Sequence, residues 1–541
     1  MPPSPVLVLV GLWGLTPSCG VWVALASAYA SSPCDLPNTL LHVLRDTILD
    51  QNMFNSDDLV KYALGGSVRI IGRREERKRL DAIVQSGRPE FVVVYGRRRV
   101  GKTYLIGEHF GNRFSFRASG LAKGSMAEQL TAFGDRLSEY GSVHTGRPKT
   151  WLEAFARLRE LLEGDDVVRF EETGRRIVFI DEMPWLDTPR SGFKTAIEYF
   201  WNGWGCTQED LVFIVCGSAT SWLVDNLLES TEGLYDRVTR VIDLQPFTLA
   251  ECQEYYVWSG VEYSCRQVVE SHMVFGGIPY YLSLQEQGLS LAQNVEALLF
   301  RRGGQLVMEF DRLFATLFRN PEPYERVVRR LAARRGGMTR SELSSSTRLG
   351  GNSLTKTLRK LEQCGFIRGF RDFTKRKKGT IFQLIDPFTL FWLTHVDRGQ
   401  IDGWMGFVGT PGYYAWAGLS FELVCLLHID EIKQALGVSG VQTSVSAWRS
   451  KETKPAAQID LLIDRRDDVV NLCEMKYSDG PYALTATDER SIRNKMAAFR
   501  AESGTRKAIH PTLITLDGAG HNAHSNSVIV GEVTVGDWLE L

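Results

Sequence analysis

The sequence predicts a multidomain α/β protein whose first folded part is built on a parallel sheet. The chain has 541 residues, and at roughly 100–200 residues per domain this length predicts three or four domains. Three uninterrupted apolar runs alternate with helix-like segments, a pattern typical of strands buried on both faces of a parallel sheet. With 63 basic residues, 64 acidic residues and 44% hydrophobic residues, the composition excludes a disordered chain and a uniformly basic nucleic-acid coat.

The first 66 residues differ in pattern from the rest of the chain. Residues 6–30 contain no charged residue, and a run of that length could span a bilayer. However, no Lys or Arg precedes Arg45, so the positive region of a signal peptide is missing. Three interpretations stay open: a non-native upstream extension, which we favour, a membrane anchor, or an exported protein. The nine cysteines form no CxxC motif, which favours reduced thiols in a cytosolic protein.

The first apolar run, Phe91–Tyr95, leads into a glycine-rich loop. Gly96-Arg97-Arg98-Arg99-Val100-Gly101-Lys102-Thr103 fits GxxxxGK[ST] at every fixed position, and a helix is expected over 103–109. The glycines let backbone N–H groups surround phosphate oxygens, and the helix N-terminus adds a partial positive charge. We therefore expect the whole loop to bind ATP, with Lys102 bridging the β- and γ-phosphates and Thr103 binding Mg²⁺.

The second apolar run, 177–180, ends in two acidic residues. Asp181 is expected to hold Mg²⁺, and Glu182 is expected to polarise the attacking water as a general base. The alternative is a solvated acidic pair at a strand end.

The third apolar run, 211–215, is followed by candidates for sensing and stabilising the transferred phosphate. Ser218 would sense the γ-phosphate, cap the following helix, or do both. Arg237 and Arg240 come next, and one of them could act as an arginine finger. The alternative for both arginines is an ordinary surface salt bridge.

The segment from Tyr324 to Thr380 is strongly basic, with 16 Lys and Arg against four acidic residues. Three helices are expected: one over 324–333, one that begins at a capping box formed by Thr339 and Glu342, and one over 352–364. Two strands are expected after them, over 366–371 and 380–385. This is the layout of a winged helix-turn-helix, which binds duplex DNA. The residues expected to contact DNA are Asn352, Ser353, Lys356, Arg359, Lys360, Lys375, Arg376, Lys377 and Lys378. Packing on the ATPase or on another protein is the alternative.

The C-terminal part contains acidic residues on a predicted hairpin with strands over 458–463 and 469–476. Glu474 and Lys476 are two residues apart, so both leave the same face of a strand. Asp460 can meet them across the hairpin, and Glu422 on an upstream helix could add a ligand. These acids suit a second divalent metal, with Lys476 orienting the water. Because the D…ExK pattern is short, an exposed hairpin with a salt bridge is the alternative.

The order of these motifs resembles the archaeal-type ATPase family, a branch of the AAA+/STAND-related P-loop ATPases. The motifs are the loop at 96–103, IVFIDEMPWL (177–186), CGSATSWL (216–223), LYDRVTRVIDLQPF (234–247) and VFGGIPYYL (274–282). The resemblance covers about Val68 to the C-terminus and implies a lid, a winged helix and a PD-(D/E)xK nuclease-like domain. It favours Ser218 as sensor and Arg237 as finger, and members usually have glycine at the position of Asp236.

The expected parts are an extension over 1–66, a P-loop ATPase core over 67–244, a helical lid over 245–320, a winged helix over 321–395 and a nuclease-like domain over 396–541. The expected function is a cytoplasmic, Mg²⁺-dependent ATPase that couples its nucleotide state to the winged helix and the nuclease-like domain. ATP and duplex DNA are the expected partners, self-association stays open, and a membrane is not expected. The alternative is a STAND-like signalling switch with protein partners and an inactive nuclease fold.

Overall fold

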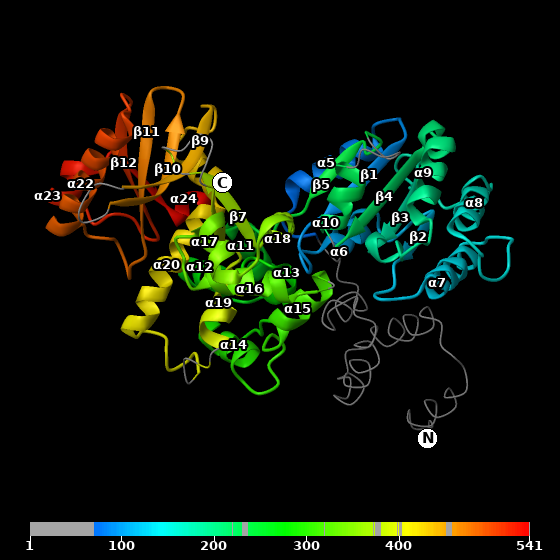
Figure 1. Cartoon of the computed structure of the whole chain (residues 1–541), viewed down its shortest axis with the longest axis horizontal. Coiled ribbons are helices and arrows are strands. Elements are labelled where there is room, and N and C mark those ends of the chain that lie inside the picture. Colours follow the sequence, from blue (N-terminus) through cyan, green and yellow to red (C-terminus); the bar gives the residue numbers. More distant parts are fainter. Residues whose placement is uncertain are drawn as a thin grey trace, which may run out of the picture. The chain divides into compact units, whose positions relative to one another are not determined.

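The computed structural model describes residues 70–218, 220–229, 236–318, 320–371, 373, 380–397, 399, 403–450 and 457–539 (Figure 1). The extension over 1–66 and the expected DNA contacts Lys375, Arg376, Lys377 and Lys378 lie outside these ranges. None of the helices within them has both the length and the apolar character of a membrane span.

A five-stranded parallel sheet follows the first described helix. Its strands are β1 (Glu90–Tyr95), β2 (Phe116–Ser119), β3 (Arg176–Asp181), β4 (Leu211–Gly217) and β5 (Arg240–Asp243), in the order β2-β3-β4-β1-β5. Every residue of β3 and β4 is buried, as the apolar runs predict for strands covered on both faces. Because all strand pairs are parallel, the glycine-rich loop after β1 and the acidic residues ending β3 lie at the same edge of the sheet.

Helices lie on both sides of this sheet (Figure 1). They are α5 (Arg74–Val84), α6 (Lys102–His109), α7 (Met126–Glu139), α8 (Trp151–Leu162) and α9 (Phe193–Gly203). The aromatic side chains of α7, α8 and α9 form one core with Phe91, Val178 and Phe213 of the sheet. This core fixes the strands whose ends carry the candidate site.

A helical part comes next, with α11 (Leu249–Ser259), α12 (Cys265–Phe275), α13 (Pro279–Ser283), α14 (Leu291–Leu299) and α15 (Glu309–Leu317). Between α12 and α13 the chain turns at Gly276 and Gly277, which have φ of 67° and 65°. A Cβ on Gly277 would lie 2.3 Å from the Phe247 carbonyl oxygen, so only glycine fits this turn. The turn leads directly into Tyr280 and Tyr281 of α13.

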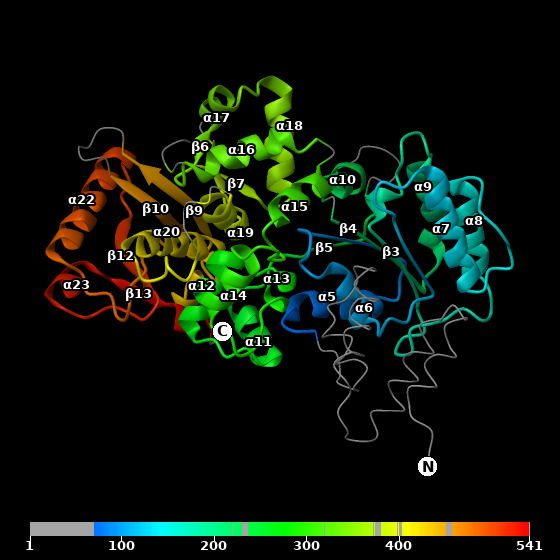
Figure 2. The ribbon, with the colours of Figure 1, turned by 90° about the horizontal axis from the view of Figure 1, so that it is seen from below.

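The basic segment forms three helices around a small antiparallel sheet of order β6-β8-β7 (Figure 2). The elements are α16 (Glu322–Ala332), β6 (Met338–Thr339), α17 (Arg340–Thr347), α18 (Gly351–Gln363), β7 (Ile367–Arg371) and β8 (Thr380–Leu384). The predicted capping box of Thr339 and Glu342 is present at the start of α17. A short helix, α19 (Pro387–Phe391), follows β8.

The C-terminal part is built on a mixed sheet of order β13-β12-β11-β10-β9. Its strands are β9 (Thr443–Arg449), β10 (Gln458–Arg465), β11 (Val469–Lys476), β12 (Ala508–Thr515) and β13 (Gly531–Thr534). Its helices are α20 (Pro411–Leu427), α21 (Ile429–Ala435), α22 (Ala486–Ser503), α23 (Ala523–Val528) and α24 (Val535–Leu539). The first strand of the hairpin is longer than the expected 458–463, because Asp464 still pairs with Val470 in the ladder.

Candidate functional site

The glycine-rich loop after β1 takes its shape from backbone conformations that few residues adopt. Gly96 has a φ of 147°, and a Cβ there would lie 2.2 Å from the Leu244 carbonyl oxygen. Gly101, with a φ of 89°, caps the N-terminus of α6, while Arg99 has a φ of 71° although it is not a glycine. A curved backbone that ends at a helix N-terminus is suited to binding phosphate.

Lys102 and Thr103 connect this loop to the end of β3. The Lys102 ammonium group donates to the carbonyl oxygens of Gly96 and Arg97, both at 3.0 Å. Thr103 Oγ1 donates to Asp181 Oδ2 at 2.8 Å. A hydroxyl and a carboxylate side by side are the oxygen donors that Mg²⁺ takes in phosphate sites, so these residues fit the metal.

The second oxygen of Asp181 is also held in place. Asp181 Oδ1 accepts hydrogen bonds from the Cys216 thiol at 2.6 Å and from the Glu182 backbone N–H at 2.9 Å. Burial, together with the nearby Asp181 carboxylate, raises the pKa of the Cys216 thiol well above its usual value, so this group stays a donor. The sequence interpretation gave Cys216 no role, although the β3–β4 pairing of Ile180 with Val215 places it next to Asp181.

Glu182 and Ser218, expected as general base and sensor, lie together. Ser218 donates to Glu182 Oε2 from its backbone N–H and from its hydroxyl, both at 3.0 Å. Glu182 has a φ of 44°, an uncommon backbone for a residue that is not glycine and one that concentrates at functional sites. The neighbouring strands β3 and β4 thus bring these two predicted residues into direct contact.

The predicted arginine finger is not engaged in the part of the chain that the structure describes. Within those ranges Arg237 is exposed and makes no hydrogen bond or ion pair. Arg240 is also exposed, and its guanidinium donates only to the Thr239 carbonyl oxygen at 3.5 Å. Asp236 has a φ of 56°, the left-handed backbone that favours glycine.

The arginines of the loop are directed to carboxylates of other elements. Arg97 Nη1 pairs with Asp386, the N-cap of α19. Arg99 Nη1 lies 3.0 Å from Glu309 Oε2 on α15. The side chains of Arg97 and Arg99 are therefore paired with carboxylates that lie outside the loop. The side chain of Arg98 is partly exposed.

Arg73 is a loop-supporting residue that the sequence interpretation missed. It is buried at the N-terminus of α5 and donates to the carbonyl oxygens of Val100 at 3.0 Å and Gln245 at 2.7 Å. Its own N–H donates to Glu251 Oε1 at 2.7 Å. The sequence signal was an arginine directly after Gly72 and before the first helix of this part.

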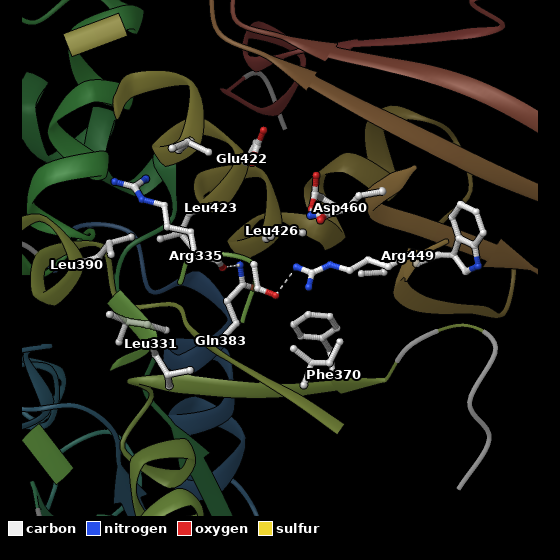
Figure 3. A pocket seen from close by; sticks show the side chains of 17 residues that line it. Leu331, Arg335, Phe370, Gln383, Leu390, Glu422, Leu423, Leu426, Arg449 and Asp460 are labelled. Atoms are coloured by element: carbon white, nitrogen blue, oxygen red, sulfur yellow. Dashed lines mark hydrogen bonds between the residues drawn. The ribbon is translucent and has the colours of Figure 1, made fainter. Parts of the chain in front are cut away.

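Two of the predicted nuclease-like residues line a cavity of about 220 Å³ that lies between the C-terminal part and the segment from α16 to β8 (Figure 3). Asp460 on β10 and Glu422 on α20 line this cavity, and Arg335 and Arg449 line it from other elements. The register that pairs Leu461 with Cys473 places Asp460 next to Glu474.

The charges around this cavity compensate one another. Glu474 Oε1 binds the Lys495 ammonium group on α22 at 2.5 Å, and Lys476 lies 6.0 Å from the ring of Tyr482. Burial, and then the Asp460 carboxylate, raise the pKa of Glu422 to about 7. In the described residues, no group of three His, Cys, Asp or Glu side chains is placed to hold a metal ion. Lys495 belongs to no motif, so no sequence pattern predicts its contact with Glu474.

The five described residues that are expected to contact DNA lie on one face of α18. Asn352, Ser353, Lys356 and Arg359 are exposed and Lys360 is partly exposed, whereas Leu354, Leu358 and Leu361 are buried on the opposite face. Arg359 Nη2 lies 2.9 Å from Asp225 Oδ1 and also pairs with Glu229, both in the segment after β4. One of the expected DNA contacts is therefore engaged with the nucleotide-binding part.

No family model matches the chain. The uncharacterized protein MJECL04 of Methanocaldococcus jannaschii is 26% identical over 337 residues, which cover 60% of this chain and 69% of that protein. The solved Walker-type ATPase PABY2304 of Pyrococcus abyssi is 19% identical with a TM-score of 0.43, covering 60% of this chain and 96% of its own. The solved ORC2 protein of Aeropyrum pernix is 16% identical with a TM-score of 0.40, and the match covers 60% of this chain and 93% of the ORC2 chain. Similarity at this level establishes neither fold nor function, so the site stands on this chain's own residues.

Proposed function

We propose that this protein binds ATP with Mg²⁺ at the loop over 96–103 and hydrolyses it. The observation that carries the proposal is the hydrogen bond of 2.8 Å between Thr103 Oγ1 and Asp181 Oδ2. It joins the end of a phosphate-binding loop to the carboxylate that ends β3. Because ATP and Mg²⁺ are available in the cytosol, we place the protein in the cytoplasm.

Each residue of the site has a role that follows from its contacts. The backbone N–H groups of the loop bind the phosphates, and Lys102 exchanges its two carbonyl partners for phosphate oxygens. Thr103 and Asp181 hold Mg²⁺, which when bound neutralises charge on the β- and γ-phosphates. Glu182 accepts a proton from the attacking water, and the two hydrogen bonds from Ser218 orient its carboxylate.

The test is ATP turnover by the full chain with Lys102→Ala. Loss of the ammonium group removes the charge that faces the phosphates, so we expect phosphate release to fall by about 10²-fold or more. Lys149→Ala, which changes an exposed lysine elsewhere, is the matched control and should keep full turnover. Turnover that survives in Lys102→Ala would show that another site hydrolyses ATP.

We extend the proposal to duplex DNA as the ligand of α18. The support is the excess of 16 basic over four acidic residues in 324–380 and the exposed polar face of α18. Phosphate contacts make binding fall steeply with salt, so affinity measured between about 50 and 200 mM salt tests this part. The second candidate function is a signalling switch with protein partners, favoured by the contact of Arg359 with Asp225 and Glu229. The switch predicts no salt-sensitive binding of duplex.

We further propose that nucleotide state controls a nuclease-like activity at the C-terminal cavity. The support is the grouping of Glu422, Asp460 and Glu474 with two lysines. Cleavage of plasmid and linear duplex is measured with Mg²⁺ or Mn²⁺, with and without ATP, beside Glu474→Ala and Lys102→Ala. We expect cleavage that Glu474→Ala abolishes. Intact ATP turnover with no cleavage under any condition would favour the signalling switch.

A further inference from the structure

Arg97 of the glycine-rich loop is buried against an acid 289 residues further along the chain. Arg97 is 5% exposed and Asp386 is 2% exposed, and the guanidinium lies 5.1 Å from the ring of Phe366. Nε and Nη2 of Arg97 have no hydrogen-bond partner. The Asp386 carboxylate pairs with a charge that burial has removed from water, and Tyr281 and Glu309 also favour the charged guanidinium.

Arg99 is held in a second pair of the same kind. Glu309, its partner at 3.0 Å, is 1% exposed and also accepts a hydrogen bond from the Tyr281 hydroxyl at 3.0 Å. The Arg99 guanidinium lies 4.1 Å from the centre of the Tyr280 ring, a cation–π distance. Two arginines two residues apart are thus fixed by carboxylates on α15 and α19.

Both pairs act on the backbone that would surround the phosphates. Arg97 and Arg99 lie between Gly96 and Gly101, and Arg99 keeps a φ of 71°. Removing one partner of a buried pair leaves an unpaired charge, so the arginine side chain and its backbone would shift to find another partner. Displacements of about 1 Å at a phosphate site are enough to impair binding and catalysis.

We propose that Asp386 and Glu309 are positioning residues of the nucleotide site, acting through Arg97 and Arg99. The inference rests on the proposed binding of ATP at this loop. Because coupling between two equilibria is reciprocal, ATP on the loop should also strengthen the docking of α15 and α19 against it. The nucleotide site then includes two acids that lie outside every phosphate-binding motif.

The experiment compares the full chain with Asp386→Asn and Glu309→Gln. In the unmodified protein the Thr389 N–H donates to Asp386 at 2.8 Å, and an amide oxygen at 386 can still accept this hydrogen bond and cap α19. An amide oxygen at 309 can still accept the hydrogen bond from the Tyr281 hydroxyl. Each variant therefore removes the charge and keeps the neighbouring bond. We expect the Kd of a fluorescent ATP analogue to rise at least about tenfold in each, which corresponds to about 1.4 kcal/mol.

Asp397→Asn is the matched control. Asp397 pairs with Arg329 at 2.5 Å in the same region of the chain without touching the loop. We expect its Kd to stay within about twofold of the unmodified protein, because a change that only weakens this region leaves the loop in place. If Asp386→Asn does not fold, Glu309→Gln decides the question, since its partner Arg99 is 21% exposed and can reach water.

A double-mutant cycle separates positioning from a general structural role. If Glu309 acts through Arg99, adding Glu309→Gln to Arg99→Met should change the Kd by less than about twofold. The inference would be overturned if the two substitutions raised the Kd independently, so that their fold-changes multiply in the double variant. An unchanged Kd in Glu309→Gln would also overturn it. Lys102→Ala distinguishes a failure of the proposed function from a failure of the positioning role. If Lys102→Ala binds the analogue normally, the proposed function fails. If Lys102→Ala loses binding while Asp386→Asn and Glu309→Gln keep it, only the positioning role fails.

Discussion

The nucleotide site and the C-terminal cavity both gather carboxylates at a sheet, but they hold them differently. At the end of β3, Asp181 has both oxygens occupied, by Thr103 on one side and by Cys216 and the Glu182 N–H on the other. At the cavity, Glu474 is paired with Lys495, and burial shifts the pKa of Glu422 to about 7. The carboxylate of the first site is held by hydroxyl, thiol and backbone donors, whereas Glu474 of the second site is neutralised by a lysine.

The difference follows from the two sheets. Parallel strands end at one edge, so the residues after β1, β3 and β4 meet without further arrangement. In the mixed C-terminal sheet, the acids come from two antiparallel strands and from α20, whose placement depends on packing. The acids of the C-terminal cavity can therefore rearrange more easily than those of the nucleotide site. Substitutions at the two sites should reveal this difference, and we take them from the largest expected effect to the smallest.

Glu182→Gln should give the largest effect. The amide cannot accept a proton from water, so we expect ATP turnover to fall by about 10²-fold or more. Ser218 still finds an oxygen at residue 182, so the Kd of ATP should change by less than about threefold. Single-turnover kinetics beside equilibrium binding give both numbers. Equal losses in affinity and turnover would mean that Glu182 shapes the site rather than acting as the base.

If the cavity binds a divalent metal as proposed, Glu422→Gln should change the pH dependence of that binding. Because the pKa of Glu422 is about 7, its carboxylate is protonated at lower pH, and Mn²⁺ binding should strengthen up to about tenfold per pH unit until pH 7. The folded state favours the neutral acid, so this group also lowers stability as pH rises from about 4.5 to 7.

Calorimetric titration of Mn²⁺ at pH 6, 7 and 8, without nucleotide, measures the metal effect. The pH dependence should vanish in Glu422→Gln and persist in Asp467→Asn, which changes an exposed acid in the turn between β10 and β11. Persistence in both variants would assign the titration to another group and make the two sites more alike than their contacts indicate.

Lys356→Ala should weaken duplex binding by a few-fold and reduce the slope of log affinity against log salt by about one. Lys356 is exposed on the polar face of α18, whereas Arg359 is engaged with Asp225. Arg359→Ala should therefore have a smaller direct effect, because its side chain already has a protein partner. Fluorescence anisotropy at several salt concentrations measures duplex affinity for the unmodified protein, Lys356→Ala and Arg359→Ala. Identical slopes of log affinity against log salt for these three proteins would exclude Lys356 as a phosphate contact.

Asp236→Gly should give the smallest effect. At a φ of 56° glycine avoids the strain of a side chain, so we expect the nucleotide-binding part to gain up to about 1 kcal/mol. Thermal unfolding should show a slightly higher Tm for the transition of the nucleotide-binding part, which is the transition that added ATP shifts. Metal binding at the C-terminal cavity should not change. A lower Tm would mean that the Asp236 side chain contributes a bond that outweighs the strain.

The sequence predicted the elements of the described chain better than their contacts. The strands around the glycine-rich loop, the capping box at Thr339 and the hairpin of β10 and β11 follow from local patterns. The contact of Ser218 with Glu182 was within reach because both residues end neighbouring strands. The pairing of Arg97 with Asp386, and of Glu474 with Lys495, depends on how separate elements pack, and no local pattern encodes that.

The pairing of Arg97 with Asp386 also has a consequence during protein synthesis. A ribosome adds about 5–20 residues per second, so the 289 residues between them take roughly 15–60 s to make. All five strands of the parallel sheet have been made once synthesis passes Asp243, but the Arg97 guanidinium lacks its carboxylate until Asp386 is added. The loop can reach its final environment only when translation has passed α19, so a nascent chain released before that point would carry an incompletely anchored nucleotide site.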